Sequence, residues 1–296
     1  MPKTAVVLLN YNDGAAAVQA AERIRGFKNI DTIILADNAS TDESPTLLSW
    51  YVRTAKTAPA EAGADSAEVI FLPNSSNGGY GWGNNRGVEE AAKRDCAYVL
   101  VANPDAVFTE ETLEKLQAAL TQEDTAAAGA LMEGRKYTDC AWPLLPFWKE
   151  LAFAGPLTKR IFKKGVSYPD TYFASLPQEA GAVHGSLFLI KTEDFLKAGG
   201  FDEGMFLFCE EKALGQRIAK NGKKIVLTDA VYGHAGSETL KKTGMGAVKR
   251  QKLRQRSERY YYKNYLHAGT FQMAVARIEQ FFVLLETAVA VLFGKA

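Results

Sequence analysis

The chain has 296 residues, of which 47% are hydrophobic and 23% are charged, a balance typical of folded globular proteins. Lys and Arg (35) nearly equal Asp and Glu (34), so the composition shows no overall signature of nucleic-acid binding. Three widely separated cysteines argue against a disulfide framework or structural zinc, and neither a secretory leader nor an apolar stretch of bilayer-spanning length is recognisable, so we expect a cytoplasmic protein.

Short apolar runs alternate with helical patterns through the N-terminal half. Ser44 followed by Pro45 marks the start of one helix, and Thr109 followed by two glutamates marks another. Residues 56–67, rich in Ala, Gly and Asp, predict a loop. Strands separated by helices predict an α/β fold with a mostly parallel, doubly wound sheet. The predicted strands are 5–9, 31–36, 69–72 and 98–102, and the predicted helices are 14–26, 44–55, 83–93 and a fourth from 109 onward.

Polar and turn-forming residues follow all four strands. Turns favour such residues for backbone reasons alone, so each set by itself is ambiguous. In open α/β sheets, however, ligands bind beyond the carboxyl ends of the strands. Four such sets at one edge therefore predict a ligand site there. They are Asn10-Tyr11-Asn12, Asp37 to Asp42, Asn77-Gly78-Gly79 and Asn103-Pro104-Asp105.

These sets form part of a longer ordered series of motifs. The series is V-V-L-L-N-Y-N, A-D-N-A-S-T-D, N-G-G-Y-G-W-G-N-N-R-G, A-N-P-D and G-G-F-D-E-G-M-F-L-F-C-E-E-K-A-L-G-Q-R. In this order it resembles the family 2 glycosyltransferases, which have the GT-A fold and invert the anomeric centre, and most closely their bacterial rhamnosyltransferase branch. The resemblance runs from Val6 to His234. It implies transfer of a sugar, from dTDP-rhamnose or a UDP-sugar, to an acceptor hydroxyl in cell-surface polysaccharide or glycolipid synthesis.

The nucleotide sugar is expected along the first strand ends. Tyr11 could stack on a pyrimidine base or face the core, and Asp37 could accept a hydrogen bond from the base or cap an Asx turn. Glycines after Asn77 would let the backbone approach a ribose or diphosphate closely. The residues expected to bind the donor are Tyr11, Asp37, Asn77, Gly79, Asn85 and Asn103.

The same glycine segment partly resembles a dinucleotide-binding fingerprint. Gly81 and Gly83 fit the spacing G-x-G-x-x-G, but Arg86 occupies the third glycine position. Two further strand–helix units also precede the segment. A dehydrogenase is therefore the weaker interpretation.

Asp105 is the only carboxylate of its motif, where family members usually carry D-x-D. The resemblance implies that Asp105 and His234 hold a divalent cation, Mn²⁺ or Mg²⁺. Such cations often take only one or two protein carboxylates and complete their shell with substrate phosphates. A nitrogen ligand from His234 would suit Mn²⁺ alongside Mg²⁺.

Glu210 and Glu211 open a predicted helix that ends near Asn221, and acidic residues in a first turn suit the helix dipole. The resemblance makes Glu211 the general base that takes the proton of the acceptor hydroxyl. Glu stands where the family usually has Asp, and Ala213 stands where another Asp is common. The second interpretation is a non-catalytic relative that binds sugar nucleotides or membranes.

We expect a catalytic domain over residues 1–240, with a nucleotide-binding half to about 108 and an acceptor-binding half beyond it, followed by a tail. Residues 141–172 mix aromatic and basic side chains, which suits either core packing or a lipid-linked acceptor. The tail has nine basic residues and one acidic residue between 241 and 263, then a helix at 271–293 that is apolar nearly all round. Such a helix must be buried on its own domain, in a homodimer or at a membrane surface.

Overall fold

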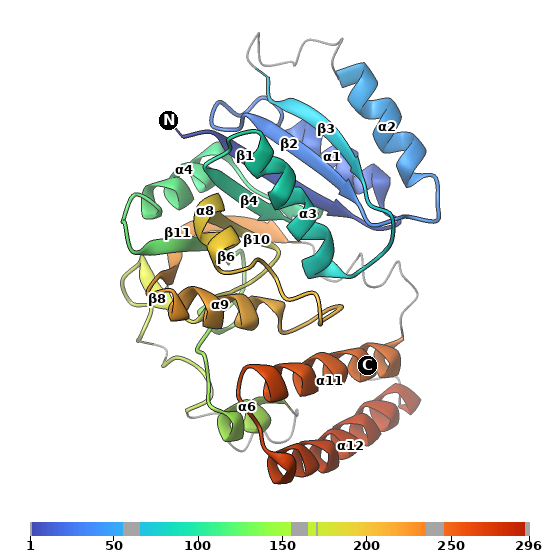
Figure 1. Cartoon of the computed structure of the whole chain (residues 1–296), viewed down its shortest axis with the longest axis vertical. Coiled ribbons are helices and arrows are strands. Elements are labelled where there is room, and N and C mark those ends of the chain that lie inside the picture. Colours follow the sequence, from blue (N-terminus) through green and yellow to red (C-terminus); the bar gives the residue numbers. More distant parts are fainter. Residues whose placement is uncertain (1, 56–65, 155–164, 170, 235–245, 294–296) are drawn as a thin grey trace.

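The structure is a computed structural model that describes residues 2–55, 66–154, 165–169, 171–234 and 246–293 (Figure 1). Its strands are β1 (Thr4–Asn10), β2 (Thr32–Asp37), β3 (Glu68–Pro73), β4 (Tyr98–Ala102), β5 (Ala106–Val107), β6 (Thr125–Met132), β7 (Ala141–Trp142), β8 (Gln178–Ala180), β9 (Ala182–Val183), β10 (Leu187–Lys191) and β11 (Lys224–His234). Its helices are α1 (Gly14–Ile24), α2 (Ser44–Ala55), α3 (Tyr80–Lys93), α4 (Glu110–Ala119), α5 (Tyr137–Cys140), α6 (Phe147–Ala154), α8 (Thr192–Lys197), α9 (Glu210–Lys220), α11 (Ala247–Asn264) and α12 (Thr270–Leu292).

Several sequence predictions fall on positions that the structure does not describe. They are most of the predicted loop at 56–67, the domain boundary at 240, the basic residues Lys159, Arg160, Lys163, Lys164, Lys241 and Lys242, and the side chain of Phe153.

Nine strands of the described chain form one sheet, in the order β3-β2-β1-β4-β10-β6-β11-β5 with β8 beside β11. Strands β3, β2, β1 and β4 are parallel, and β6 is parallel to β11, which confirms a mostly parallel sheet. However, β10 runs antiparallel between β4 and β6, and β5 and β8 run antiparallel to β11. The sequence does not reveal these reversals, because an apolar run has the same pattern in either direction.

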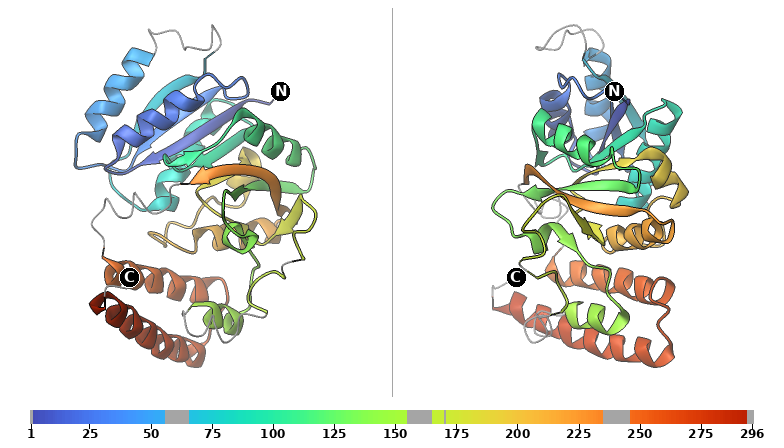
Figure 2. Two further views of the ribbon diagram at one scale, coloured as in Figure 1. Left: turned by 180° about the vertical axis from the view of Figure 1, so that it is seen from behind. Right: turned by 90° about the vertical axis from the view of Figure 1, so that its left-hand side faces the viewer.

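Helices cover both faces of this sheet. Helices α3 and α8 lie on one face, and α1 and α4 lie on the other (Figure 2). Ala5 to Leu8 of β1 are at most 1% exposed, and Ile33 to Ala36 of β2 are fully buried. Burial on both faces explains why these strands are continuous apolar runs instead of alternating patterns.

The C-terminal helices α11 and α12 pack on each other as a separate layer, and α11 lies between α12 and the rest of the molecule (Figures 1 and 2). The helix predicted at 271–293 is therefore present, one residue earlier at each end. No helix in the described ranges is long and apolar enough to cross a bilayer.

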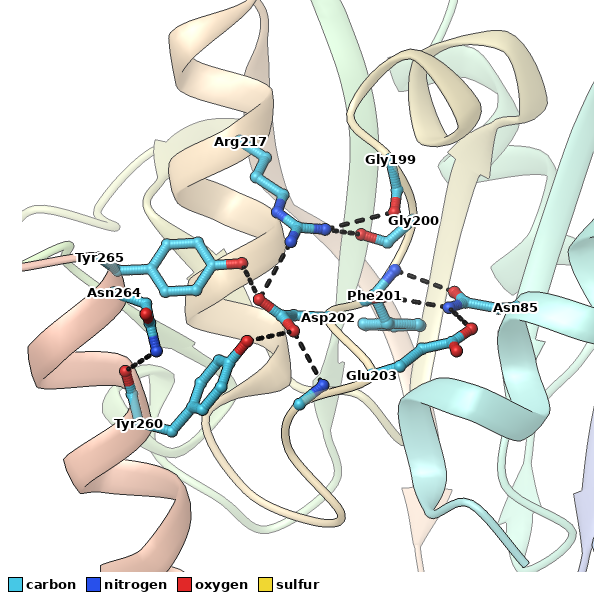
Figure 3. Close-up of polar contacts among 11 residues, drawn as sticks. Asn85, Gly199, Gly200, Phe201, Asp202, Glu203, Arg217, Tyr260, Asn264 and Tyr265 are labelled. Atoms are coloured by element: carbon cyan, nitrogen blue, oxygen red, sulfur yellow. Dashed lines mark hydrogen bonds and ion pairs between the residues drawn. The ribbon is translucent and has the colours of Figure 1, made fainter. Parts of the chain in front are cut away.

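The carboxylate of Asp202 fastens α11 to the loop that precedes α9 (Figure 3). It accepts hydrogen bonds from Tyr265 Oη at 2.6 Å and Tyr260 Oη at 3.1 Å, both from the C-terminal end of α11 or just beyond it. It also accepts one from Arg217 Nη2 of α9 at 3.0 Å and one from the amide of Gly204 at 2.9 Å. Three segments distant in sequence thus meet at one charged group.

Burial by itself would raise the pKa of Asp202. The hydrogen bonds from Tyr265 and Gly204 and the charge of Arg217 outweigh burial, so the pKa lies below its usual value. A carboxylate whose pKa is lowered on folding stabilises the folded state above its unfolded pKa, and this contribution is lost as the pH falls through the folded value.

We expect Asp202→Ala to lower the free energy of unfolding by about 3 kcal/mol at neutral pH, because it leaves Arg217 and two tyrosine hydroxyls without their shared partner. Urea denaturation measures this loss, which should shrink as the pH approaches the pKa of Asp202. The control is Asp229→Ala, which removes an ion pair with Lys115. The side chain of Asp229 is 61% exposed. That loss should stay below about 1 kcal/mol. Equal losses in the two variants would contradict the role of Asp202.

Candidate active site

The carboxyl ends of β1, β2 and β4 lie side by side at one edge of the sheet. In the register of the strands, Asn10 lies opposite Asp37, and Leu8 lies opposite Ala102. The polar residues predicted at these strand ends therefore share one edge, as the position of ligands in open α/β sheets requires.

Asp37 is 1% exposed. Its carboxylate caps the turn that follows, which is the alternative role that the sequence allows for it. Its carboxylate accepts hydrogen bonds from Asn10 Nδ2 at 2.7 Å, Ser40 Oγ at 2.6 Å and Ser40 N at 3.0 Å. A carboxylate has about four lone-pair positions, so most of its capacity is used within the protein. Tyr11 is half-buried beside this turn, directly after β1. A contact of Asp37 or Tyr11 with a base stays a prediction.

The segment from Asn77 to Tyr80 is held by the side chain of Asn77 and by the loop before α9, where the carbonyl oxygen of Phe206 accepts a hydrogen bond from the amide of Tyr80 at 2.9 Å. Oδ1 of Asn77 accepts a hydrogen bond from the amide of Gly79 at 3.1 Å. Gly79 has φ +101°, and a Cβ there would lie 2.1 Å from the carbonyl oxygen of Phe206. Both the backbone conformation and the close approach therefore require glycine at 79.

Asn85 does not face this edge. Its Nδ2 donates to the carbonyl oxygen of Phe201 and to Glu203, each at 3.0 Å, and its Oδ1 accepts from the amide of Phe201 at 2.9 Å (Figure 3). These contacts tie α3 to the loop that carries Asp202. The structure thus gives Asn85 a structural role and does not bring it to the donor side.

A cavity of about 850 Å³ opens at the same edge of the sheet. Among the predicted site residues, it is lined by Asn103, Asp105, Glu211 and His234. Strand ends, α9 and α11 all contribute to its wall, which also includes His184, Gly185, Arg135, Arg254, Glu258 and Tyr261.

Asp105 and His234 are adjacent because β5 pairs with β11. The register places His234 opposite Ala106, and Oδ1 of Asp105 lies 3.3 Å from Nδ1 of His234. Both atoms are buried and neither has a hydrogen-bond partner in the described structure. A buried polar atom without a partner is costly, and a divalent cation is one group that would satisfy a carboxylate oxygen and an imidazole nitrogen together.

The described residues contain no group of three or more His, Cys, Asp or Glu side chains placed to hold a metal ion. Among the described residues, Asp105 and His234 therefore fit a cation as a two-residue site, whose remaining positions need other ligands. Hard divalent cations are bound in this way when substrate phosphates and water complete the shell.

Glu210 and Glu211 form the first turn of α9, after two residues in the left-handed region: Phe208 with φ +75° and Cys209 with φ +70°. Such conformations are costly for residues other than glycine, and they direct the start of the helix toward the cavity. Glu210 is 2% exposed, and its Oε2 has no partner in the described structure. The chain therefore accepts both backbone strain and a buried carboxyl at this point.

Burial raises the pKa of both carboxyl groups, and the charge of Glu211 raises that of Glu210 further. For Glu211, a backbone hydrogen bond from Gly185 and the charges of Lys212 and Arg254 oppose the effect of burial. A raised pKa makes the carboxylate of Glu211 a stronger base than an exposed glutamate.

The segment His184-Gly185-Ser186 lies between Glu211 and the Asp105–His234 pair. The rings of His184 and His234 lie 6.0 Å apart, and burial lowers the pKa of His184 to about 4. A Cβ on Gly185 would lie 2.6 Å from Oε1 of Glu211. Ser186 Oγ is 2.5 Å from Tyr232 Oη of β11. This segment bears no recognisable motif, so only the fold shows its position.

Helix α11 forms one wall of the cavity, a role that the basic composition of this segment does not indicate. Gln251, Arg254 and Glu258 of α11 line the cavity. Ala213, where the family often has Asp, is fully buried in a cluster with Phe147 of α6 and residues of α11. A carboxylate at 213 would be buried in this apolar packing, which accounts for the alanine.

Comparisons with known proteins agree with this architecture. The model of the family described as glycosyl transferase family 2 matches residues 5–185. An N-acetylglucosaminyl-diphospho-decaprenol L-rhamnosyltransferase of Mycobacterium tuberculosis is 28% identical over 204 residues, which cover 64% of this chain and 62% of that protein. Rhamnosyltransferase WbbL of Escherichia coli is 24% identical over 168 residues, 53% of this chain and 61% of that protein. The matches thus span less than two thirds of these relatives.

Two solved structures share the fold at low sequence identity. The mannosyltransferase PcManGT of Pyrobaculum calidifontis, in complex with GDP-Man and Mn²⁺, has a TM-score of 0.60 and 16% identity, covering 98% of this chain and 74% of that one. GalNAc-T7 with UDP, GalNAc and Mn²⁺ has a TM-score of 0.59 and 18% identity, covering 90% of this chain and 50% of that one. The fold is therefore of the GT-A type. Because the family model matches more than half of the chain, this protein belongs to glycosyl transferase family 2.

Proposed function

We propose that this chain transfers a sugar from a nucleoside-diphosphate donor to an acceptor hydroxyl, with inversion at the anomeric carbon and with Glu211 as the general base. The observation that carries the proposal is that Asp105, His234 and Glu211 line one cavity at the carboxyl edge of the sheet. The reaction needs two groups from the protein. One is a pair of metal ligands, an oxygen and a nitrogen, and the other is a carboxylate that can act as a base.

Asp105 and His234 would hold a divalent cation, Mn²⁺ or Mg²⁺. The cation supplies neutralisation of the negative charge on the departing nucleoside diphosphate. The fit rests on two buried atoms, Asp105 Oδ1 and His234 Nδ1, for which the described part of the chain offers no hydrogen-bond partner. Their 3.3 Å separation suits two ligands that share one ion.

Glu211 would remove the proton from the acceptor hydroxyl while the oxygen forms its bond to the anomeric carbon. The bond from that carbon to the diphosphate oxygen breaks, and its electron pair leaves with the nucleoside diphosphate. The transition state should be oxocarbenium-like, as in glycoside hydrolysis. Gly185 leaves room for the carboxylate of Glu211 and donates its backbone hydrogen bond.

The donor is expected to lie along the strand-end edge from Tyr11 and Asp37, past Asn77 and Gly79, to Asn103. Asn103 is already fixed by its amide, which donates to the carbonyl oxygen of Ser186 at 2.9 Å. Because two curated relatives are named rhamnosyltransferases, dTDP-rhamnose is the proposed donor, with a UDP-sugar as the alternative.

The proposed acceptor is a lipid-linked glycan of cell-surface polysaccharide or glycolipid synthesis. This follows the name of the Mycobacterium tuberculosis relative, which specifies a diphospho-decaprenol-linked sugar. In this chain, Arg135 and Arg254 line the cavity and offer guanidinium groups to a diphosphate.

Divalent cation should be required for tight donor binding. We expect dTDP with Mn²⁺ to raise the melting temperature of the protein more than dTDP with chelator does, since a ligand at 100 times its Kd stabilises by about 2.7 kcal/mol. Asp105→Ala and His234→Ala should each lose the metal-dependent part of this shift, whereas Asp229→Ala should keep it. Full turnover in excess chelator would contradict the metal role.

Glu211→Gln should lower sugar transfer on the order of 10²–10⁴-fold and leave donor binding intact, because a general base acts on the acceptor. Glu210→Gln is the matched control and should retain transfer. It should not reduce stability at neutral pH, because the raised pKa of Glu210 means that its ionisation opposes folding. Transfer assays and donor thermal shifts measure both. The reverse pattern would place the base at Glu210.

Gly185→Ala should reduce transfer on the order of 10²-fold with little change in melting temperature. The added methyl group would lie 2.6 Å from Oε1 of Glu211, so the flexible carboxylate must move away from its position. The control is Gly269→Ala, because the nearest atom to a Cβ there is 3.8 Å away. If Gly185→Ala transfers sugar at the normal rate, the observed position of Glu211 is not the catalytic one.

A further inference from the structure

We propose that helices α11 and α12 form a docking surface for a membrane containing anionic lipid. The surface combines an exposed apolar face on α12 with a basic stripe on α11. It lies outside the cavity, and the proposal does not depend on the sugar-transfer reaction.

Helix α12 buries little of its surface on the rest of the chain. Of its 23 residues, only Ala276, Gln280 and Val283 are buried, and these lie on the side that packs on α11. Large apolar side chains are exposed on the opposite side, within an arc of about 80° at 3.6 residues per turn. This apolar face consists of Phe271, Ile278, Phe282, Leu285, Val289 and Leu292, which are 43–82% exposed.

Trp148 of α6 extends the apolar face at one end. It is 53% exposed, and its ring lies 6.5 Å from that of Phe271. The charged residues of α12, Arg277, Glu279 and Glu286, fall outside the arc of the face. A helix that is apolar on its outer side needs a further apolar environment to cover it.

Helix α11 carries basic side chains at helical spacing on its open flank. The basic stripe consists of Lys249, Lys252, Arg256, Arg259 and Lys263, and it also spans about 80° of the helix. Four of these residues are exposed, and Arg259 is half-buried. The only acidic residue in α11, Glu258, is buried away from the stripe and accepts a hydrogen bond from Gln280 of α12.

The stripe and the apolar face belong to one unit. Arg259 Nη1 of the stripe donates to Gln280 Oε1 of α12 at 2.7 Å, and Gln255 Nε2 donates to the carbonyl oxygen of Gln280 at 2.6 Å. On the other side of the stripe, Ser257 Oγ donates to the carbonyl oxygen of Leu207 at 2.7 Å. The stripe thus borders α12 and stays open to solvent.

Charge complementarity favours a lipid surface over a second copy of the chain. A two-fold contact through α12 repeats the same patch on both subunits, so it gathers two five-residue basic stripes around one interface, to which each subunit's α11 and α12 offer Glu286 as their one exposed acidic residue. An anionic bilayer satisfies both features: headgroups attract the stripe, and the acyl boundary covers the apolar face. The same helix α11 lines the cavity, so docking would place the cavity beside the membrane.

The test is sedimentation of the full chain with phosphatidylcholine vesicles, with and without phosphatidylglycerol. We expect binding that needs the anionic lipid and weakens at high salt, since added salt screens charges. Lys252→Glu/Arg256→Glu should lower the ratio of bound to free protein at least about tenfold at low salt. Phe282→Glu/Leu285→Glu should lower it at every salt concentration.

Matched variants elsewhere serve as controls. Lys28→Glu/Lys220→Glu makes the same change in charge at exposed lysines outside α11 and α12, and Trp50→Glu alters a 55% exposed apolar side chain on α2. These variants should bind vesicles as the unmodified chain does, and melting curves check that all of them fold. Donor thermal shifts should be unchanged throughout, so loss of docking is separable from loss of the sugar-transfer site.

Two results would overturn the proposal. One is equal binding to neutral and anionic vesicles, or none to either. The other is a dimer in solution that Phe282→Glu/Leu285→Glu converts to monomer while vesicle binding is unchanged, which would assign the apolar face to a second copy of the chain.

Discussion

The Asp202 carboxylate is the junction on which the shape of the site depends. Its hydrogen bonds from Tyr260 and Tyr265 hold the C-terminal end of α11, and its ion pair with Arg217 holds α9, whose first turn contains Glu211. One half-buried charge therefore holds both the helix that carries the proposed base and the helix that closes the cavity. Because hydrogen bonds to a charged group are stronger than neutral ones, a single residue can join these segments.

The site is built at a cost in stability that the rest of the fold must offset. Among the described residues, Asp105, His234 and Glu210 each have a buried polar atom without a hydrogen-bond partner, and Phe208 and Cys209 adopt left-handed conformations. Such features cluster where a protein must present reactive groups, because a polar atom whose hydrogen bonds are all made within the protein is less available to a ligand. Strands β1 and β2, whose residues are buried except for Leu9, supply the compensating apolar packing.

The C-terminal helices contribute both to the cavity wall and to the outer surface of the molecule. One side of α11 contributes Arg254 and Glu258 to the cavity wall, while its open flank carries the basic stripe. Helix α12 adds apolar surface but reaches neither the sheet nor the cavity lining described here. A family 2 transferase that acts on a lipid-linked acceptor would need both functions close together, because its acceptor does not leave the bilayer.

The sequence by itself determined the local elements and the order of the motifs. Strand β4 and helix α2 begin and end where the sequence placed them, and Thr109 caps α4 as predicted. These features depend on periodicity and capping, which act over a few residues. The motifs likewise identified the family and selected Asp105, Glu211 and His234, which the fold then gathers around one cavity.

Only the tertiary structure decided which side chains face that cavity. It turned Asn85 toward residues 201–203, brought His184 and Gly185 between the proposed metal pair and the proposed base, and reversed β10 within the sheet. It also made α11 a wall of the cavity when its composition suggested a separate tail. The physical reason is that strand direction and helix docking depend on pairings between distant segments, such as Asp202 with Tyr265, and no local pattern in the sequence encodes such a pairing.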